Sequence, residues 1–315
     1  MKTGFARVVL FILVALLTQS SFATENGRST YAPGTAGDFS IAVLPEAKGF
    51  YLRNELWYYT ANNTYQALNG AVSVDADLTA WVDIPRMTWV SGWTLLGARH
   101  GAYLTLPAAF VTSKANIEQN VPGQPTSSIT QKGDRLSFSD IYFAPLILDW
   151  KVGSVDIMWM ETATIPSGTY DSDRTVNVSR NHWALNSSLA ATWRHPSGGP
   201  ELDARLGYIV NSENPDTEYR SGNELALDWT AAWRLDQQWA MGVTGYAYEQ
   251  LTGDRGDGAV LGDFKGRSVG AGPIVRRIFS CGDRRMALVG KWIHEFDASN
   301  RYEGDLFFVA LSTRL

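Results

Sequence analysis

Apolar and polar residues alternate along residues 71–84, and one parity of this segment is apolar throughout. Asp75, Asp77 and Asp83 stand on the other parity. Residues 223–234 repeat the pattern, with Leu, Trp and Ala on one parity and charged or hydroxyl side chains between them. Because successive side chains of a strand point to opposite faces of a sheet, each segment predicts a strand with one apolar and one polar face.

The pattern recurs about twelve times after residue 47, which predicts an all-β fold. The expected strands lie near residues 48–60, 71–84, 102–112, 138–150, 154–165, 187–195, 201–211, 223–235, 237–250, 265–279, 285–296 and 304–315. Residues 85–98 fit this pattern least well. They either extend the second strand past Pro85 or form a separate element.

Short and long connections alternate between these strands. Short turns are expected at residues 97–101, 151–153, 195–200, 236 and 280–284, with longer polar segments at 61–70, 113–137, 166–186, 212–222, 251–264 and 297–303. Outer-membrane barrels have short periplasmic turns and long outside loops, and closure leaves no unpaired strand edge in lipid. We therefore predict a transmembrane antiparallel up-and-down β-barrel of about twelve strands, of the outer-membrane type. Its apolar parity is expected to face lipid, and its polar parity to face the lumen.

The N-terminus has the features of an export signal. Lys2 and Arg7 precede an apolar run at residues 8–17, and a small-x-small cleavage site ends at Ala23. The run is shorter than the roughly 20 residues of a spanning helix. We predict a signal peptide at 1–23 cleaved after Ala23, a tail or plug at 24–47, a barrel at 48–315, and a location in the outer membrane of a Gram-negative bacterium.

Composition narrows the function classes. The chain has 12 Trp, 13 Tyr and 13 Phe, which suit aromatic girdles at the two membrane interfaces. The formal charge is −5 and becomes −7 without the signal peptide, which holds two basic and no acidic residues, so no nucleic-acid partner is expected. Cys281 is the only cysteine, which excludes an intrachain disulfide and a multi-cysteine metal site. No metal or cofactor is expected, and the barrel is expected to be a monomer in outer-membrane lipid.

Charged residues on the polar parity are candidates for the lumen or its constriction. They are Arg53, Glu55, Asp75, Asp77, Glu224, Asp228, Arg234, Lys265 and Arg267, together with Asp83, Asp203 and Arg205. Opposite charges inside a closed barrel either pair with one another or form a polar constriction that selects solutes. Both interpretations remain open at this point.

A second part of the inward surface is apolar. Met158 and Met160 stand on the inward parity, and Tyr142 and Phe143 lie in a run, 141–148, that is apolar on both parities. Such a wall suits a small hydrophobic solute, although interior packing would require the same residues.

Prolines within the expected strands indicate breaks in the wall. Pro107, Pro145 and Pro273 cannot donate to a strand ladder, and Gly270 and Gly272 weaken the pairing beside Pro273. We predict a lateral gap at one of these places, through which an apolar solute could leave the lumen for the bilayer.

Several segments together resemble a known family. They are residues 140–150 (DIYFAPLILDW), 166–174 (PSGTYDSDR), 179–183 (SRNHW), 218–229 (EYRSGNELALDW) and 262–273 (GDFKGRSVGAGP), and GTAGDF at 34–39 fits as well. They resemble the outer-membrane proteins named for the meta-pathway of phenol degradation. The resemblance implies a twelve-stranded channel for small hydrophobic or aromatic compounds, with the option of a lateral exit, and implies no catalytic residues. Two positions depart from expectation: Ser179 replaces a glycine, and the chain ends in Leu315 where many outer-membrane barrels end in Phe.

Two other functions compete with transport. An outer-membrane lipid hydrolase would need a nucleophile and a base, yet His100, His182, His195 and His294 fall in no recognisable catalytic arrangement. A structural or adhesive barrel is the other alternative, and the DRGDG loop at 254–258 is its one supporting motif. We expect no enzyme.

Overall fold

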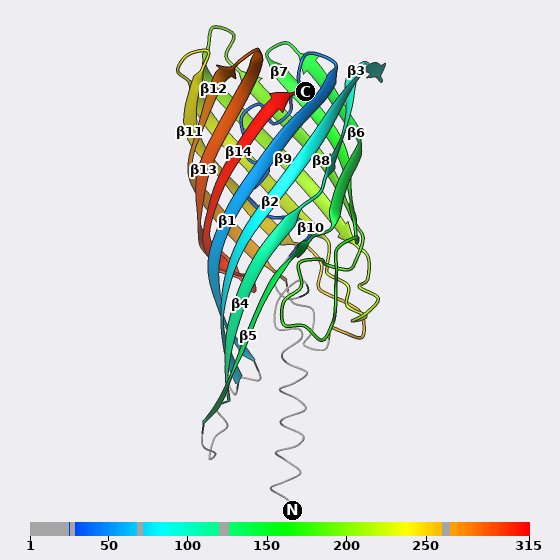
Figure 1. Ribbon diagram of the computed structural model, residues 1–315, viewed down its shortest axis with the longest axis vertical. Coiled ribbons are helices and arrows are strands. Elements are labelled where there is room, and N and C mark those ends of the chain that lie inside the picture. Colours follow the sequence, from blue (N-terminus) through cyan, green and yellow to red (C-terminus); the bar gives the residue numbers. More distant parts are fainter. Residues whose placement is uncertain (1–24, 26–28, 68–71, 120–125, 260–264) are drawn as a thin grey trace, which may run out of the picture.

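One antiparallel sheet contains every strand of the computed structural model, which describes residues 25, 29–67, 72–119, 126–259 and 265–315 (Figure 1). The strands are β1 (Gly49–Ala67), β2 (Val72–Leu95), β3 (Ala98–Thr105), β4 (Ala108–Gln119), β5 (Ser127–Phe138), β6 (Ile141–Val152), β7 (Val155–Ile165), β8 (Ala184–Arg194), β9 (Gly199–Asn211), β10 (Glu224–Arg234), β11 (Trp239–Gln250), β12 (Arg267–Cys281), β13 (Arg284–Ser299) and β14 (Glu303–Arg314). The described residues include no helix long and apolar enough to cross a bilayer. The predicted signal peptide and its cleavage site lie outside the described residues.

The sheet closes into a barrel because β1 pairs with both β2 and β14. The ring then runs through β3, β6 and the consecutive strands β7 to β14, which makes twelve strands around the wall among the described residues. Every pairing in it is antiparallel. The predicted fold, an all-β transmembrane barrel of about twelve strands, is confirmed.

The remaining two strands, β4 and β5, continue ring strands beyond the barrel. β2 pairs with β3 through Arg86↔Thr105 and with β4 through Asp83↔Ala108, in one unbroken register. The interruption between β3 and β4 lies opposite Pro85, whose carbonyl accepts the Leu106 N–H at 3.2 Å. The uncertain stretch 85–98 therefore extends the second strand past its proline, to Leu95.

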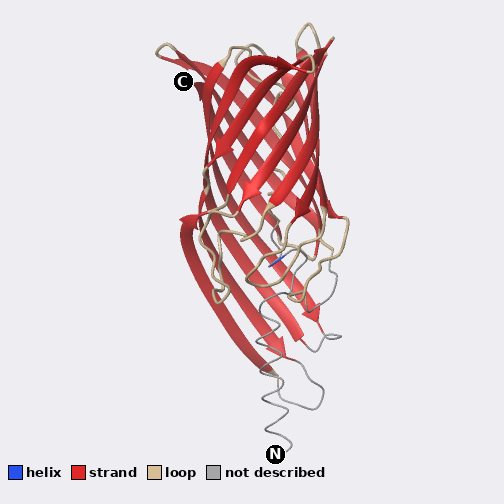
Figure 2. Cartoon of the chain, turned by 90° about the vertical axis from the view of Figure 1, so that its right-hand side faces the viewer, coloured by secondary structure: helices blue, strands red, loops and turns tan. Residues whose placement is uncertain are grey.

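We call the projecting part of this sheet the flap: the far ends of β1 and β2 with all of β4 and β5 (residues 61–67, 72–83, 108–119 and 127–138). Figures 1 and 2 show it extending past the rest of the wall. The prediction that 61–70 and 113–137 are long polar loops is wrong, because strands occupy most of both segments. Polar residues stand on both parities there, since part of the flap meets water, and this hid the strands.

The two ends of the barrel differ. Tight turns at Leu96–Gly97, Gly153, Gly198 and Gly282, all with positive φ, lie at the end that holds the C-terminus (Figure 1). The longer connections lie at the opposite end, with the flap. By the rule for outer-membrane barrels, the tight turns are periplasmic and the flap is extracellular.

Side chains alternate across the wall as a lipid-embedded barrel requires. On β10 and β11, Leu227, Trp233 and Met241 are exposed on the outside, whereas Asp228 and Tyr246 are buried inside. The predicted faces of residues 223–234 are therefore those of the structure.

Residues 71–84 have the opposite arrangement. Ala76, Leu78 and Ala80 are buried on the inner face, where they pack with Val176 and Val178 of the loop after β7. The aspartates of this segment point outward instead. The prediction that its apolar parity faces lipid is wrong, because this part of β2 runs into the flap, whose inner face is covered by the loop and whose outer face carries the aspartates.

Candidate functional site

The interior of the barrel is occupied by residues 29–47, which we call the N-terminal segment. Wall side chains accept its backbone N–H groups: Ser40 to Glu201 at 2.7 Å, Ile41 to Asp203 at 3.0 Å, Ala42 to Thr192 at 3.0 Å and Leu44 to Asp149 at 2.9 Å. Three wall carboxylates and one hydroxyl thus provide the acceptors that a segment without secondary-structure partners needs.

The centre of the N-terminal segment is held by two wall residues. The Nζ of Lys291 on β13 donates to the carbonyls of Gly34, Thr35 and Gly37 at 2.8, 2.9 and 2.6 Å. The Asp228 carboxylate on β10 accepts the hydroxyl of Tyr31. A cation therefore binds the carbonyl side of the turn at residues 34–37, and an anion binds Tyr31, three residues before Gly34.

The chain enters the lumen among the extracellular loops. The carboxylate of Glu25 accepts hydrogen bonds from the Asn214 amide at 2.8 Å, the Thr217 hydroxyl at 2.8 Å and the Tyr170 hydroxyl at 3.1 Å. Burial, and then the adjacent Glu25 carboxylate, raise the pKa of Tyr170. Residues 29–47 lie in the lumen and lead to β1 at the periplasmic end.

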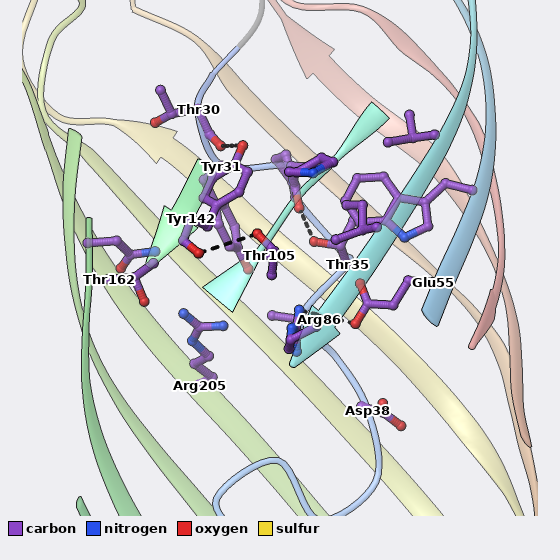
Figure 3. A pocket seen from close by; sticks show the side chains of 18 of the residues that line it. Thr30, Tyr31, Thr35, Asp38, Glu55, Arg86, Thr105, Tyr142, Thr162 and Arg205 are labelled. Atoms are coloured by element: carbon purple, nitrogen blue, oxygen red, sulfur yellow. Dashed lines mark hydrogen bonds and ion pairs between the residues drawn. The ribbon is translucent and has the colours of Figure 1, made fainter. Parts of the chain in front are cut away.

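A cavity of about 560 Å³ lies between the N-terminal segment and the wall, a volume typical of small-molecule sites (Figure 3). Its apolar lining includes Leu78, Ala80, Val82, Ala109, Val111, Met158, Met160 and Val178. Its charged lining consists of Arg53, Arg86, Arg180, Arg205 and Arg301 with Asp38, Glu55 and Glu295, a formal excess of two positive charges. The cavity is thus apolar over much of its wall and cationic at its charged part, although the whole chain is acidic.

The family model described as "Putative MetA-pathway of phenol degradation" matches residues 61–311. The chain belongs to this family. Its membership accounts for the motifs that the sequence shares with such proteins, and it makes the chain an outer-membrane channel-like barrel. A search of curated proteins finds no match.

The chain is also similar to solved structures of outer-membrane proteins. The COG4313 outer membrane channel from Pseudomonas putida F1 is 15% identical, with a TM-score of 0.65, and the match covers 90% of this chain and 100% of that one. A Pseudomonas aeruginosa FadL homologue is 9% identical over 93% of this chain and 98% of its own, with a TM-score of 0.30. At such identities the first similarity establishes the fold, and the second supports no further argument.

Five of the nine predicted lumen residues of this phenol-degradation family member face inward. Arg53 binds Asp38 at 2.5 Å and Glu55 at 2.8 Å beside the cavity. Glu224 accepts hydrogen bonds from Asn211 at 2.7 Å and Tyr248 at 2.9 Å. Asp228 binds the N-terminal segment, and Arg234 lies 3.6 Å from Glu201 near the periplasmic end. Most of these charges contact other protein groups.

The other four predicted lumen residues do not line the lumen, and that prediction is wrong for them. Asp75 and Asp77 are exposed on the outer face of the flap, Lys265 is exposed just before β12, and Arg267 pairs outside with Asp297 at 3.1 Å. All four lie at the extracellular end. The outer face meets water there, so a charged residue does not mark the inner one.

Three of the four residues predicted for the hydrophobic pathway line the cavity, and the fourth points outward. Tyr142, Met158 and Met160 line the cavity, and the Tyr142 hydroxyl donates to the Thr30 carbonyl at 2.8 Å. Phe143 points to the outside, so its assignment to the pathway is wrong. Neighbouring residues of one strand cannot both face the same cavity.

The predicted gap residues mark irregular places in the wall. Pro145 lies within a register shift between Phe143 and Leu146, and Gly270 lies at another shift on β12. At Gly272 and Pro273 the ladder between β12 and β13 is interrupted, although pairing resumes on both sides. Pro107 stands between β3 and β4, and it alone of the five lines the cavity.

Sequence reasoning missed several residues that bind the N-terminal segment, above all Asp149, Glu201 and Lys291. Each stands on the inward parity of its strand. Lys291 alternates with Val289, Ile293 and Glu295, so the inner face of β13 is of mixed character. Parity alone could have placed these residues inside, but it gave no indication of what they bind.

Proposed function

We propose that this outer-membrane barrel is a channel for the passive uptake of small hydrophobic or aromatic compounds. The cavity carries the proposal, because its apolar lining and volume match a small apolar solute better than a hydrated sugar. It adjoins the lumen at a level where the outer wall carries exposed apolar residues such as Trp81 and Phe110. The family membership supports the same function.

The N-terminal segment is proposed to act as a plug. Its hydrogen bonds to the carboxylates of several strands leave little room for an aqueous path beside it. A solute that enters from the extracellular side would therefore stop in the cavity until the segment shifts or a lateral path opens. This assigns the charged lumen residues mainly to plug binding and not to solute selection.

A lateral exit is proposed beside β5, where the closed wall ends. Within the described residues, β5 has β4 on one side and no strand on the other. Pro107 and Ser139, at the base of this free edge, both line the cavity. Leu136 and Phe138 are strongly exposed on the outer face there, which indicates contact with lipid. A solute leaving the cavity at this edge would enter the bilayer without crossing the plug.

Uptake by a deletion strain tests the proposal. We expect the strain to accumulate labelled toluene several-fold more slowly than the parent, and full-length protein to restore the rate. In liposome swelling, purified protein is expected to admit small sugars poorly, because the plug fills the lumen. Unchanged uptake across a panel of hydrophobic solutes would favour a structural or adhesive barrel. Release of fatty acids from phospholipid would favour the hydrolase, yet among the described residues no histidine has both a serine and a carboxylate as hydrogen-bond partners.

A further inference from the structure

Arg205 is an arginine of the cavity that has no counterion among the described residues. Within the described part of the chain, Arg53 pairs with Asp38 and Glu55, and Arg86 pairs with Glu55 at 3.1 Å. Arg205, on the inner face of β9, has neither an ion pair nor a hydrogen bond there, and Figure 3 shows its guanidinium beside the cavity with no dashed contact. A charge held away from bulk water without a partner is unfavourable, so a ligand that supplies one gains affinity.

The expected partner of Arg205 is engaged elsewhere. Asp228 lies directly across from Arg205 in the register of β9 and β10. Its carboxylate instead accepts the Tyr31 hydroxyl and lies against the backbone amides of residues 34–37. The fold thus uses the acid for the N-terminal segment and leaves the base to the cavity.

Groups around Arg205 complete an anion-binding pole. Arg86 lies within electrostatic range of Arg205, and its Nε has no hydrogen-bond partner in the described part of the chain. The Arg86 guanidinium lies 5.0 Å from the ring centre of Tyr103, and the Tyr103 hydroxyl is 3.1 Å from Thr162 Oγ1.

The opposite wall of the same cavity is apolar, with Leu78, Val111 and Met160 in its lining. We propose that the preferred ligand is a small amphipathic carboxylate, whose apolar body lies on this wall and whose carboxylate binds Arg205 and Arg86. The planar guanidinium fork matches the two oxygens of a carboxylate and provides bidentate binding. This inference rests on the proposed function and specifies its substrate class.

Binding to the purified mature protein in detergent tests the inference, with four probes measured by calorimetry at neutral pH. Benzoate has both an apolar ring and a carboxylate, benzamide and toluene lack the charge, and acetate lacks the ring. We expect benzoate to bind at least about tenfold more tightly than benzamide or acetate, which is the scale of one charge-assisted hydrogen bond. High salt should reduce this preference.

Substitutions test whether Arg205 causes the preference for benzoate over benzamide. Arg205→Met is expected to remove the preference for benzoate over benzamide and to leave toluene binding within about twofold of wild type. Arg205→Lys keeps the charge without the fork, and an intermediate affinity is expected. Arg276→Met is the matched control, because Arg276 also faces inward, against the ring of Phe39, but does not itself line this cavity. Heat-modifiable migration on gels verifies that each barrel is folded.

The possible failures are distinct. Equal binding of benzoate and benzamide to wild type, or an unchanged preference in Arg205→Met, overturns the inference while toluene binding keeps the proposed function. Acetate binding as tight as benzoate binding reveals a simple anion site and also overturns it. If no probe binds wild type, both the inference and the proposed function fail.

Discussion

Lys291 is the residue on which the position of the N-terminal segment depends most directly, since one ammonium group satisfies three backbone carbonyls. Lys291→Met would leave these carbonyls without a donor. Hydrogen bonds to charged groups contribute about 1.5–3 kcal/mol each, and we expect the segment to lose roughly 2–4 kcal/mol of binding free energy, because some carbonyls regain water. Liposome swelling with small sugars should therefore be faster for the variant than for wild type.

Lys151→Met is the matched control for this substitution, because Lys151 is exposed near the periplasmic turn after β6. Its swelling rate should equal that of wild type. If Lys291→Met is folded on gels but its swelling rate is as low as that of wild type, the other anchors suffice to keep the lumen closed.

His182, just before β8 and outside the membrane, makes the extracellular loops sensitive to acid. Burial lowers the pKa of His182, and the nearby Arg180 opposes protonation as well, which outweighs the favourable charges of Glu25 and Asp140. The unfolded chain binds this proton near pH 6.5, before the folded one does. The contribution to stability is thus fully present above about pH 6.5 and is lost as the pH falls below it.

Unfolding by urea at pH 7.5 and pH 5.5 tests the direction of this change in stability with pH. The wild-type protein is expected to lose more stability across this range than His182→Asn, which cannot titrate. Equal losses in the two proteins would mean that His182 stays neutral at both pH values or is protonated without cost.

At the scale of elements, apolar and polar residues alternate in both β2 and β10, but the apolar residues of the two strands face different environments. The closed barrel of about twelve strands could be predicted from segments with a two-residue period, because a closed barrel is the β structure in which every backbone group is paired in lipid. The face that meets lipid did not follow. Leu227 of β10 points to lipid, whereas Leu78 of β2 points inward and is covered by a loop about a hundred residues away. Only tertiary contacts of this kind, which parity does not encode, decide such cases.

For the same reason, the sequence predicted the positions of some candidate site residues and not of others. Glu55 and Asp228 could be placed inside from the sequence, since the strands that carry them lie within the membrane and have an unambiguous outer face. Arg267 could not, because it lies at a strand end that both faces share with water. The partner of Asp228 could not be predicted either, because the N-terminal segment shows no periodicity that would place it in the lumen.

The flap is expected to be dispensable for assembly, because the ring closes through β3 and β6 without its outer part. Lys114 and Lys132 are directly paired, so residues 115–131 can be replaced by Asn-Gly, which forms a two-residue hairpin turn. The shortened protein should fold to a heat-modifiable barrel and retain toluene binding. Deletion of β8 opens the ring and serves as the negative control. Failure of the shortened protein to assemble would show that the flap forms part of the folding nucleus.

At the scale of the whole molecule, the chain passes through its own barrel. Glu25 is held by extracellular loops, residues 34–37 by β13, and residues 40–44 by strands β6, β8 and β9, before β1 begins at the periplasmic end. The N-terminal segment therefore links both ends of the lumen to most of the wall. A shift at any one anchor would alter the space beside the cavity.

A reversible cross-link tests whether the segment must move. A Cβ built on Gly37 would lie 2.5 Å from Thr244 Oγ1, and Gly37 has no positive φ, so cysteines at both positions would have Cβ atoms near the roughly 3.8 Å of a disulfide. In a Cys281→Ser background, the oxidised Gly37→Cys/Thr244→Cys protein should take up toluene about as fast as its reduced form, because the proposed exit beside β5 bypasses the segment. Each single cysteine should leave uptake unaffected by oxidation. Slower uptake by the oxidised protein would mean that the segment must move, and it would contradict the exit beside the free edge of β5.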